Sequence, residues 1–148
     1  MAYPDKKSLL KWAQNYPELW NAGDKQAWID NWHSVATGEF RMLDPVGTPE
    51  KHGFKSCCED SWDLFQERVR FRIQPGTLFV CANEVAWCLE NHFDGPDGPQ
   101  VQYSLETYQF GDDGSVMIRT YYRVPAHDNE NLGDIFEQYL PENEKGLE

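Results

Sequence analysis

The order of two hydrophobic periodicities constrains this fold more than any other feature of the sequence. Before residue 68, apolar residues recur at helical spacing in three segments, at 8–20, 25–33 and 53–68. After residue 68 the pattern changes to short alternating runs, at 69–73, 77–81, 85–93, 101–110 and 115–123. Helices followed by a run of antiparallel strands indicate an α+β domain with one sheet.

Glycine and proline residues mark where these elements end. Asn21-Ala22-Gly23-Asp24 predicts the end of the first helix and the N-cap of the second. Pro17 lies inside the first helical segment, and we expect a kink or restart there because proline removes one backbone hydrogen bond. A short strand at 39–43 precedes a turn at 44–49, which two prolines and a glycine make rigid.

The chain has 148 residues, which is the size of a single domain with its own hydrophobic core. We place this domain at 1–126. The remaining residues, 127–148, form an acidic C-terminal extension, and apolar spacing at 129–139 predicts a short helix within it. Aromatic residues make up 14% of the chain and include six Trp, so some of these rings are expected to line a cavity.

Charge and cysteine usage exclude several classes of function. A net charge of −12 repels nucleic acid and anionic membranes, so neither is an expected partner. No apolar run has the length of a membrane span or a signal peptide, which predicts a cytoplasmic protein. The four cysteines have no metal-ligand spacing, and we interpret all four as small buried thiols. Neither a metal nor another cofactor is expected.

Four segments, taken in order, resemble the bacterial steroid Δ5-isomerases. They are the Asn21–Asp24 break, Asp44-Pro45-Val46-Gly47 followed by His52-Gly53, the run from Val80 to Trp87, and the final hairpin that begins at Tyr108-Gln109-Phe110. The likeness spans roughly residues 8–123 and extends to SnoaL-like proteins of the nuclear transport factor 2-like superfamily. It implies three N-terminal helices on a strongly curved, mainly antiparallel sheet, forming a cone-shaped, cystatin-like α+β barrel. It also implies a pocket for a small apolar or polycyclic ligand, and a homodimer.

The resemblance also implies an active site. Carried over position by position, the general base is Asp44, the oxyanion-donating tyrosine is Tyr16, and the protonated oxyanion donor is Glu106. Here the chain departs from the family, because Glu106 replaces the usual aspartate and Pro17 directly follows Tyr16. Moving a double bond next to a carbonyl requires a base that shuttles a proton and donors that stabilise the developing oxyanion.

Strand periodicity adds a physical reason for Glu106. Tyr108 and Phe110 share its face of the strand, and an apolar surrounding keeps a carboxylic acid neutral because the ionised form is poorly solvated there. Aromatic residues of the sheet are the expected ligand contacts, namely Trp87, Tyr108, Phe110 and Tyr122. His33, which ends the second helix, is an alternative acid/base group if it approaches Asp44.

Each of these residues also has a purely structural interpretation. Asp44 can simply begin a turn, Tyr16 can fill the core, and Glu106 can pair with Arg119 or Arg123. The leading hypothesis is an acid/base isomerase of the Δ5-3-ketosteroid type, acting on a steroid-like or polycyclic ketone through a dienolate. The alternatives are a non-catalytic domain that binds a small apolar ligand, and a SnoaL-like polyketide cyclase or dehydratase. A shared fold does not choose among them.

Overall fold

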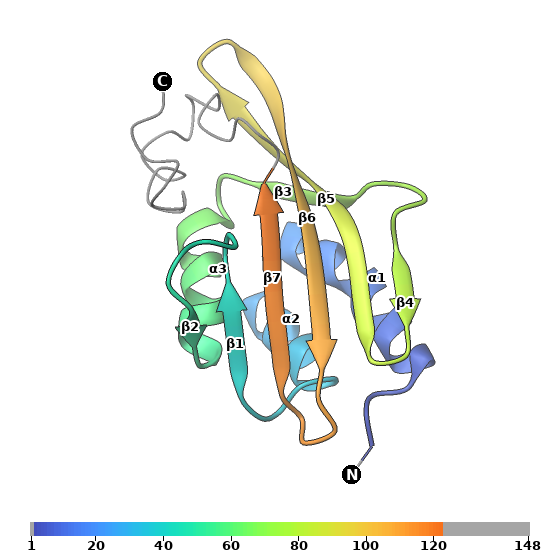
Figure 1. Ribbon diagram of the computed structural model, residues 1–148. Helices are drawn as coiled ribbons and strands as arrows, with labels where there is room; N and C mark the ends of the chain where they lie inside the picture. The colour runs from blue at the N-terminus through green and yellow to red at the C-terminus, as the bar shows by residue number, and fades with distance from the viewer. Residues whose placement is uncertain (1, 123–148) are drawn as a thin grey trace.

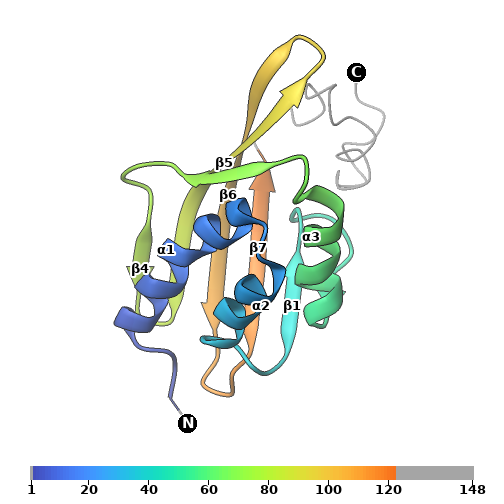
Figure 2. The same cartoon turned by 180° about the vertical axis from the view of Figure 1, so that it is seen from behind.

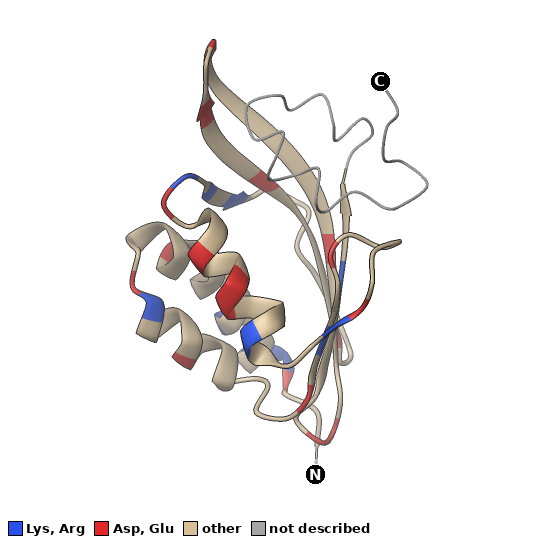
Figure 3. Ribbon diagram, turned by 90° about the vertical axis from the view of Figure 1, so that its left-hand side faces the viewer, with Lys and Arg blue, Asp and Glu red and all other residues tan. Residues whose placement is uncertain are grey.

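A computed structural model describes residues 2–122 as an α+β domain in which the helices cover one face of a curved sheet (Figures 1, 2 and 3). This confirms the fold class expected from the sequence. The helical elements are α1 (Lys6–Ala22), α2 (Lys25–His33), the π-helical turn η1 (Lys55–Glu59) and α3 (Asp60–Phe65). The predicted C-terminal helix and extension lie outside the described residues.

Within residues 2–122 the sheet has seven strands and is antiparallel except at one pair. Its strands are β1 (Phe40–Leu43), β2 (Lys51–His52), β3 (Arg70–Ile73), β4 (Phe79–Cys81), β5 (Glu84–Gly95), β6 (Gly98–Phe110) and β7 (Val116–Tyr122). The order is β2-β1-β7-β6-β5-β3, and β4 pairs with the first part of β5. Strand β1 runs parallel to β7, with Leu43 opposite Arg119, which brings the turn after β1 next to the end of β7 (Figure 1).

The expected break at Pro17 is wrong, because α1 runs without interruption from Lys6 to Ala22. Asp5 caps its first turn by accepting a hydrogen bond from the Ser8 amide, and Gly23 ends it in the left-handed conformation. The inner face of α1 buries large rings, including Trp12 and Trp20. Burial of this face outweighs the one backbone hydrogen bond that a proline removes.

Two other expected boundaries are also corrected. The third helix is not continuous over 53–68, since a π-helical turn opens it and α3 ends at Phe65. The sequence places no strand at 94–100, between the expected runs at 85–93 and 101–110, whereas the structure continues both strands into a tight hairpin in which β5 and β6 remain paired as far as Gly95 and Gly98. Gly98 has a φ of 117°, a conformation that only glycine adopts readily, and it lets the chain reverse within two residues.

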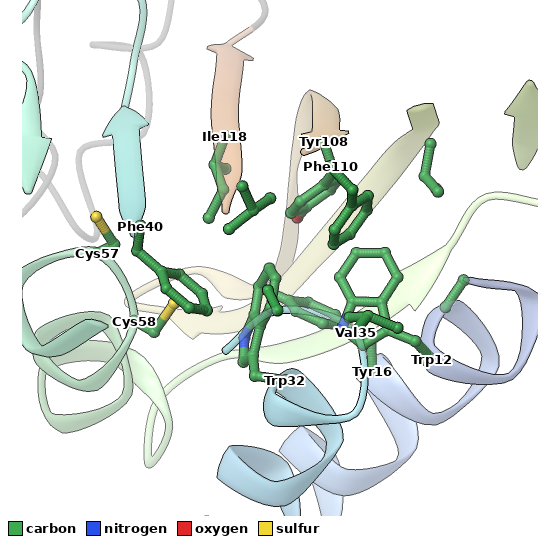
Figure 4. Packing of buried hydrophobic residues seen from close by; sticks show 14 of the residues in the cluster. Trp12, Tyr16, Trp32, Val35, Phe40, Cys57, Cys58, Tyr108, Phe110 and Ile118 are labelled. Atoms are coloured by element: carbon green, nitrogen blue, oxygen red, sulfur yellow. The ribbon is translucent and has the colours of Figure 1, made fainter. Parts of the chain in front are cut away.

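The core lies between the helices and the concave face of the sheet, and tryptophan dominates it. Five of its members are fully buried indoles: Trp12, Trp20, Trp28, Trp32 and Trp87. Figure 4 shows Trp12, Tyr16 and Trp32 of the helices facing Tyr108 and Phe110 of β6. In the described part of the chain, none of the helices combines the length and apolarity needed to cross a bilayer.

The four cysteines are not all buried, contrary to the interpretation of the sequence. Cys57 and Cys58, both in η1, are buried in the core, whereas Cys81 is exposed and Cys88 is half-buried. Cys81 ends the short strand β4, which pairs with β5 alone, and Cys88 points away from the helices on the outer face of β5. Apolar character alone could not distinguish the two faces of a strand at these positions.

Candidate functional site

A small cavity of about 60 Å³ opens between the helices and the sheet, and we call it the cone cavity. All three α-helices contribute apolar residues to its wall, among them Trp20, Trp28 and Phe65. Its polar lining comes mainly from the concave face of the sheet: Asp44, Asn91, Glu106, Tyr108 and Tyr122. Tyr16 also lines it, so the three residues predicted to form the active site all reach the same space.

Glu106 occupies the middle of β6 and is 8% exposed. Its Oε1 accepts two hydrogen bonds, from Trp87 Nε1 at 2.7 Å and from the Tyr108 hydroxyl at 2.9 Å. Burial raises the pKa of Glu106 to about 7, and the donors from Trp87 and Tyr108 limit the rise. Of the two partners expected in the structural interpretation, Arg119 is not among its hydrogen-bond partners within the described residues, and Arg123 lies outside them. Glu106 is therefore a carboxyl group that can hold a proton near neutral pH.

Tyr16 and Tyr108 place two phenol groups beside this carboxyl. Tyr16 projects from α1, its ring lies 5.2 Å from that of Trp87, and a side-chain hydrogen bond joins it to Tyr108. Burial, followed by the charge of Glu106, raises the pKa of both tyrosines well above the ordinary value. Both phenols therefore stay protonated and can donate hydrogen bonds.

Asp44 directly follows β1 and is held by the end of β7. Its Oδ1 accepts hydrogen bonds from Thr120 Oγ1 at 2.5 Å and from the Tyr122 hydroxyl at 3.3 Å. The Val46 amide donates to the Thr120 carbonyl, so backbone and side chain fix the turn to the same residue. Burial raises the pKa of Asp44, while the donors from Thr120 and Tyr122 and the charge of Lys51 oppose the rise.

Asp44 also borders a second, wider depression on the outside of the molecule, which we call the outer groove. This groove measures about 760 Å³ and is lined largely by polar and charged residues: Asp44, Thr48, Glu50, Lys51, His52, Ser56, Asp60 and Asp63, together with Pro49 and Leu64. Asp44 lines both spaces, whereas Glu106 lines only the cone cavity. Asp44 and Glu106 are about equally buried, at 6% and 8% exposed, so they differ in the spaces that they border and not in their exposure.

The structure divides the predicted ligand contacts into two groups. Tyr108 and Tyr122 line the cone cavity, whereas Trp87 and Phe110 lie in the core behind it. Trp87 reaches the site indirectly, through its hydrogen bond to Glu106.

His33 is exposed at the end of α2, where its ring packs on Phe54 at 4.9 Å, and it does not line the cavity. The structure therefore does not bring His33 together with Asp44 in that cavity.

Sequence reasoning missed three polar residues of the site. Thr120 holds Asp44, and Ser104 and Asn91 form a hydrogen-bonded pair next to Glu106. Strand alternation could have placed Ser104 on the face of Glu106, two residues away. No local signal identifies Thr120 or Asn91, because each depends on pairing between strands. Within residues 2–122, no three His, Cys, Asp or Glu side chains gather as a metal site would require.

Comparison with known proteins identifies the fold through structure rather than sequence. No protein-family model matches the chain, and no curated protein matches it. SalBIII, described as an epoxide hydrolase/cyclase-like enzyme in pyran ring formation of the polyether salinomycin, has a TM-score of 0.63 and 17% sequence identity. The match covers 81% of this chain and 94% of SalBIII.

Two further solved structures have the same architecture. RV0760c from Mycobacterium tuberculosis, solved with estradiol-17beta-hemisuccinate, has a TM-score of 0.60 and 16% identity over 79% of this chain and 95% of its own. A protein from Jannaschia sp. CCS1, assigned as a SnoaL-like polyketide cyclase, has a TM-score of 0.63 and 15% identity over 88% of this chain and 96% of its own. At these identities the likeness establishes the fold. The chain therefore has the nuclear transport factor 2-like cone fold.

Proposed function

We propose that the protein is an acid/base enzyme that enolises a small cyclic or polycyclic ketone, with Asp44 as the base and Glu106 as the acid. One observation supports this above all others: two buried carboxyls, both with raised pKa values, line a single cavity with largely aromatic walls. Perturbed carboxyls in an enclosed space are typical of acid/base catalysis.

The environments of the two carboxyls assign their roles. Two hydroxyl donors and the charge of Lys51 favour the ionised form of Asp44. Glu106 is surrounded by neutral groups, and the charge of Asp44 raises its pKa further. Near neutral pH the pair therefore holds one proton on Glu106 and leaves Asp44 as the carboxylate, and the pair titrates as a coupled unit.

The proposed reaction begins when Asp44 removes a proton from the carbon next to the substrate carbonyl. The electron pair of that C–H bond forms a carbon–carbon double bond as the π pair of the C=O bond moves onto the oxygen, to which the hydroxyl of neutral Glu106 and the phenol of Tyr16 donate hydrogen bonds. Asp44 then returns its proton to another carbon, which shifts a double bond. Alternatively, the enolate carbon attacks a second carbonyl of the same molecule and closes a ring, and the proton held by Asp44 passes to the alkoxide that forms. No redox cofactor is required for either outcome, because electrons and atoms balance.

The size of the cavity bears on the substrate. At about 60 Å³ the cone cavity is smaller than the pockets of roughly 300 Å³ or more that hold drug-sized ligands, so a polycyclic ligand must displace side chains of the wall. The steroid-derived ligand of RV0760c supports a steroid-like substrate, and the cyclase assignments of the other two neighbours support a polyketide. The proposal covers both, because each is a ketone with acidic C–H bonds.

The decisive experiment compares Asp44→Asn and Glu106→Gln with the wild type on a Δ5-3-ketosteroid, following formation of the conjugated ketone. Loss of the base is expected to lower kcat by about 10³-fold, and loss of the acid by about 10²-fold. Asp94→Asn, on the exposed end of β5, is the matched control and should retain full activity.

A wild type that does not turn over the steroid excludes steroid isomerisation. In that case, hydrogen–deuterium exchange at the α-carbon of smaller cyclic ketones, measured by NMR in D₂O, tests enolisation itself. If wild-type exchange equals that of Asp44→Asn, Asp44 is not the base. Saturable binding of an aromatic phenol without any exchange would instead favour the non-catalytic binding domain.

The outer face of the sheet also supports the predicted homodimer. Leu105 of β6 and Tyr121 of β7 are cross-strand partners, and their side chains are 49% and 41% exposed. Pairing of two such faces would remove both side chains from water. Light scattering at micromolar concentration should give the mass of two chains, and Leu105→Lys should shift it to one. A monomeric wild type contradicts the proposal.

A further inference from the structure

The two oxygens of Glu106 have different surroundings. Oε1 accepts the two short hydrogen bonds, from Trp87 and Tyr108, at 2.7 and 2.9 Å. Oε2 has one longer contact, with Ser104 Oγ at 3.4 Å. A carboxyl oxygen that already accepts two strong donors has no room for its own proton, so the neutral acid carries its proton on Oε2.

Ser104 in turn is held by Asn91, which lies across the strand pair on β5 and lines the cone cavity. The Asn91 Nδ2 group donates to the Gln102 carbonyl at 2.8 Å and to Ser104 Oγ at 3.1 Å. A backbone carbonyl can only accept, which fixes the amide with its nitrogen toward β6. Because Ser104 Oγ accepts from Asn91, its own proton is left to point elsewhere, and Oε2 of Glu106 is the acceptor within reach.

We propose that Glu106 acts on the substrate through Oε2, and that Asn91 and Ser104 are positioning residues that orient this oxygen. The proposal deepens the function proposed above and rests on it for the identity of the reaction. Asn91 touches Glu106 only through Ser104, so the two residues act in series. When Glu106 is ionised, the Ser104 hydroxyl donates to Oε2, and when Glu106 is neutral, the proton on Oε2 is the one that is donated to the substrate oxygen.

The other groups that face Glu106 come from three elements. Tyr16 lies on α1, Tyr108 on β6 itself and Asp44 after β1, and each influences the same carboxyl. None of them contacts Oε2 by a hydrogen bond among the described residues. The Asn91–Ser104 pair can therefore be altered without changing the groups that surround Oε1.

The test is the titration of Glu106, followed by carbon-13 NMR of the glutamate side-chain carboxyls, with Glu106→Gln assigning the signal. The donor from Ser104 favours the ionised form, so Ser104→Ala should raise the pKa of Glu106 by roughly half a unit. Ser104→Thr, which keeps the hydroxyl, should restore the wild-type value. Thr107→Ala removes a hydroxyl from the opposite face of β6 and should change nothing.

The action in series has its own signature in a double-mutant cycle. Asn91→Leu should raise the pKa of Glu106 in the wild-type background but leave it unchanged in Ser104→Ala. Additive shifts would show that Asn91 acts independently, and a Ser104→Ala value equal to that of the wild type would overturn the proposal. Spectra with native dispersion confirm that each variant is folded. If Ser104→Ala does not fold, Ser104→Thr keeps the test valid.

Activity separates this inference from the proposed function. On any ketone that the wild type enolises, Ser104→Ala should lower kcat severalfold with little change in KM, because the donor is misdirected after the substrate has bound. If no ketone is enolised but the Glu106 titration responds as expected, the proposed function fails and the positioning pair remains. If enolisation occurs while the titration is unaffected by either residue, the positioning pair fails alone.

Discussion

Two parts of the cone-cavity wall carry the same chemical group in different settings, and we call them the Glu106 end and the Asp44 end. At one end, Glu106 is enclosed by strand β6, by the Trp87 indole and by two phenols. At the other end, Asp44 sits on a turn at the sheet edge, is held by two hydroxyl donors and also borders the charged outer groove. The comparison shows that one fold gives two carboxyls different surroundings, which is the basis of the acid and base roles proposed above.

This difference extends to proton exchange with solvent. Asp44 borders a groove that carries both Lys51 and several carboxylates, whereas every neighbour of Glu106 described above is neutral apart from Asp44 itself. In the proposed reaction, the proton that Asp44 removes would have a polar environment close by, and the proton on Glu106 would not. We expect a charged group to be stable beside Asp44 and unfavourable beside Glu106.

The largest expected effect concerns stability at the Glu106 end. A pKa that folding raises from 4.5 to about 7 stabilises the native state fully below pH 4.5, and this contribution is lost as the pH rises through 7. The free energy of unfolding should therefore fall by about 3 kcal/mol between pH 4.5 and 8. Urea unfolding at several pH values measures it.

Glu106→Gln should remove most of this fall, because glutamine does not titrate. Glu84→Gln, an exposed position at the start of β5, is the control and should keep the pH dependence of the wild type. Asp44 contributes in the same direction, since its pKa is also raised, so a part of the fall persists in Glu106→Gln. An unchanged slope in Glu106→Gln would mean that the Glu106 end is not the more strongly perturbed one.

A smaller effect is expected when the Asp44 end loses its stronger donor. Thr120→Val keeps the shape of the side chain but removes the hydroxyl that donates to Asp44, and should cost about 2 kcal/mol of stability. It should also raise the pKa of Asp44, which moves the acidic limb of the kcat/KM profile to higher pH. The alkaline limb should move less than the acidic limb, because Glu106 contributes most to it although the two carboxyls titrate as a coupled pair. A larger movement of the alkaline limb would contradict this assignment.

The second donor to Asp44 should matter less than the first. Tyr122→Phe removes a hydroxyl that lies 3.3 Å from Asp44, at the long end of hydrogen-bond distances. The expected loss of stability is below about 1 kcal/mol, with a shift of the acidic limb in the same direction as for Thr120→Val. Thermal unfolding and the pH profile together measure both. A larger effect than that of Thr120→Val would reverse the order of the two donors.

The smallest effect is expected outside the cavity. His33→Ala should change kcat less than twofold and stability by no more than about 0.5 kcal/mol, because His33 is exposed and packs only at the edge of Phe54. A strong loss of activity with normal unfolding would show that His33 reaches Asp44 during turnover. It would also restore the histidine as an acid/base group.

The fold could be predicted from the sequence because the helical spacing, the strand spacing and the family resemblance all indicated the same fold. Helical spacing came first and strand spacing second, and the order of four short segments matched one family. Tyr16, Asp44 and Glu106 were found by that likeness, and they do line one cavity. Alternation along a strand predicts which face a side chain lies on, but not how far along the strand the cavity extends. It therefore could not distinguish Tyr108, which lines the cavity, from Phe110, which lies in the core.

The groups that hold the carboxyls could not be predicted in the same way. Thr120 is 76 residues away from Asp44, and only the parallel pairing of β1 with β7 brings them together. Asn91 reaches Ser104 only through the register of β5 on β6. Pro17 shows the converse, since a local rule predicted a break that tertiary packing overrides.

The parallel pairing of β1 with β7 has a consequence for the order in which the protein can assemble. A nascent chain that has emerged as far as residue 115 already contains Asp44, Glu106 and the whole of the helical layer. It lacks the strand that supplies Thr120 and Tyr122, and β1 has only its short pairing with β2. Contacts between residues so distant in sequence are slow to form. Maturation of the Asp44 end is therefore a late event of folding, tied to the arrival of β7.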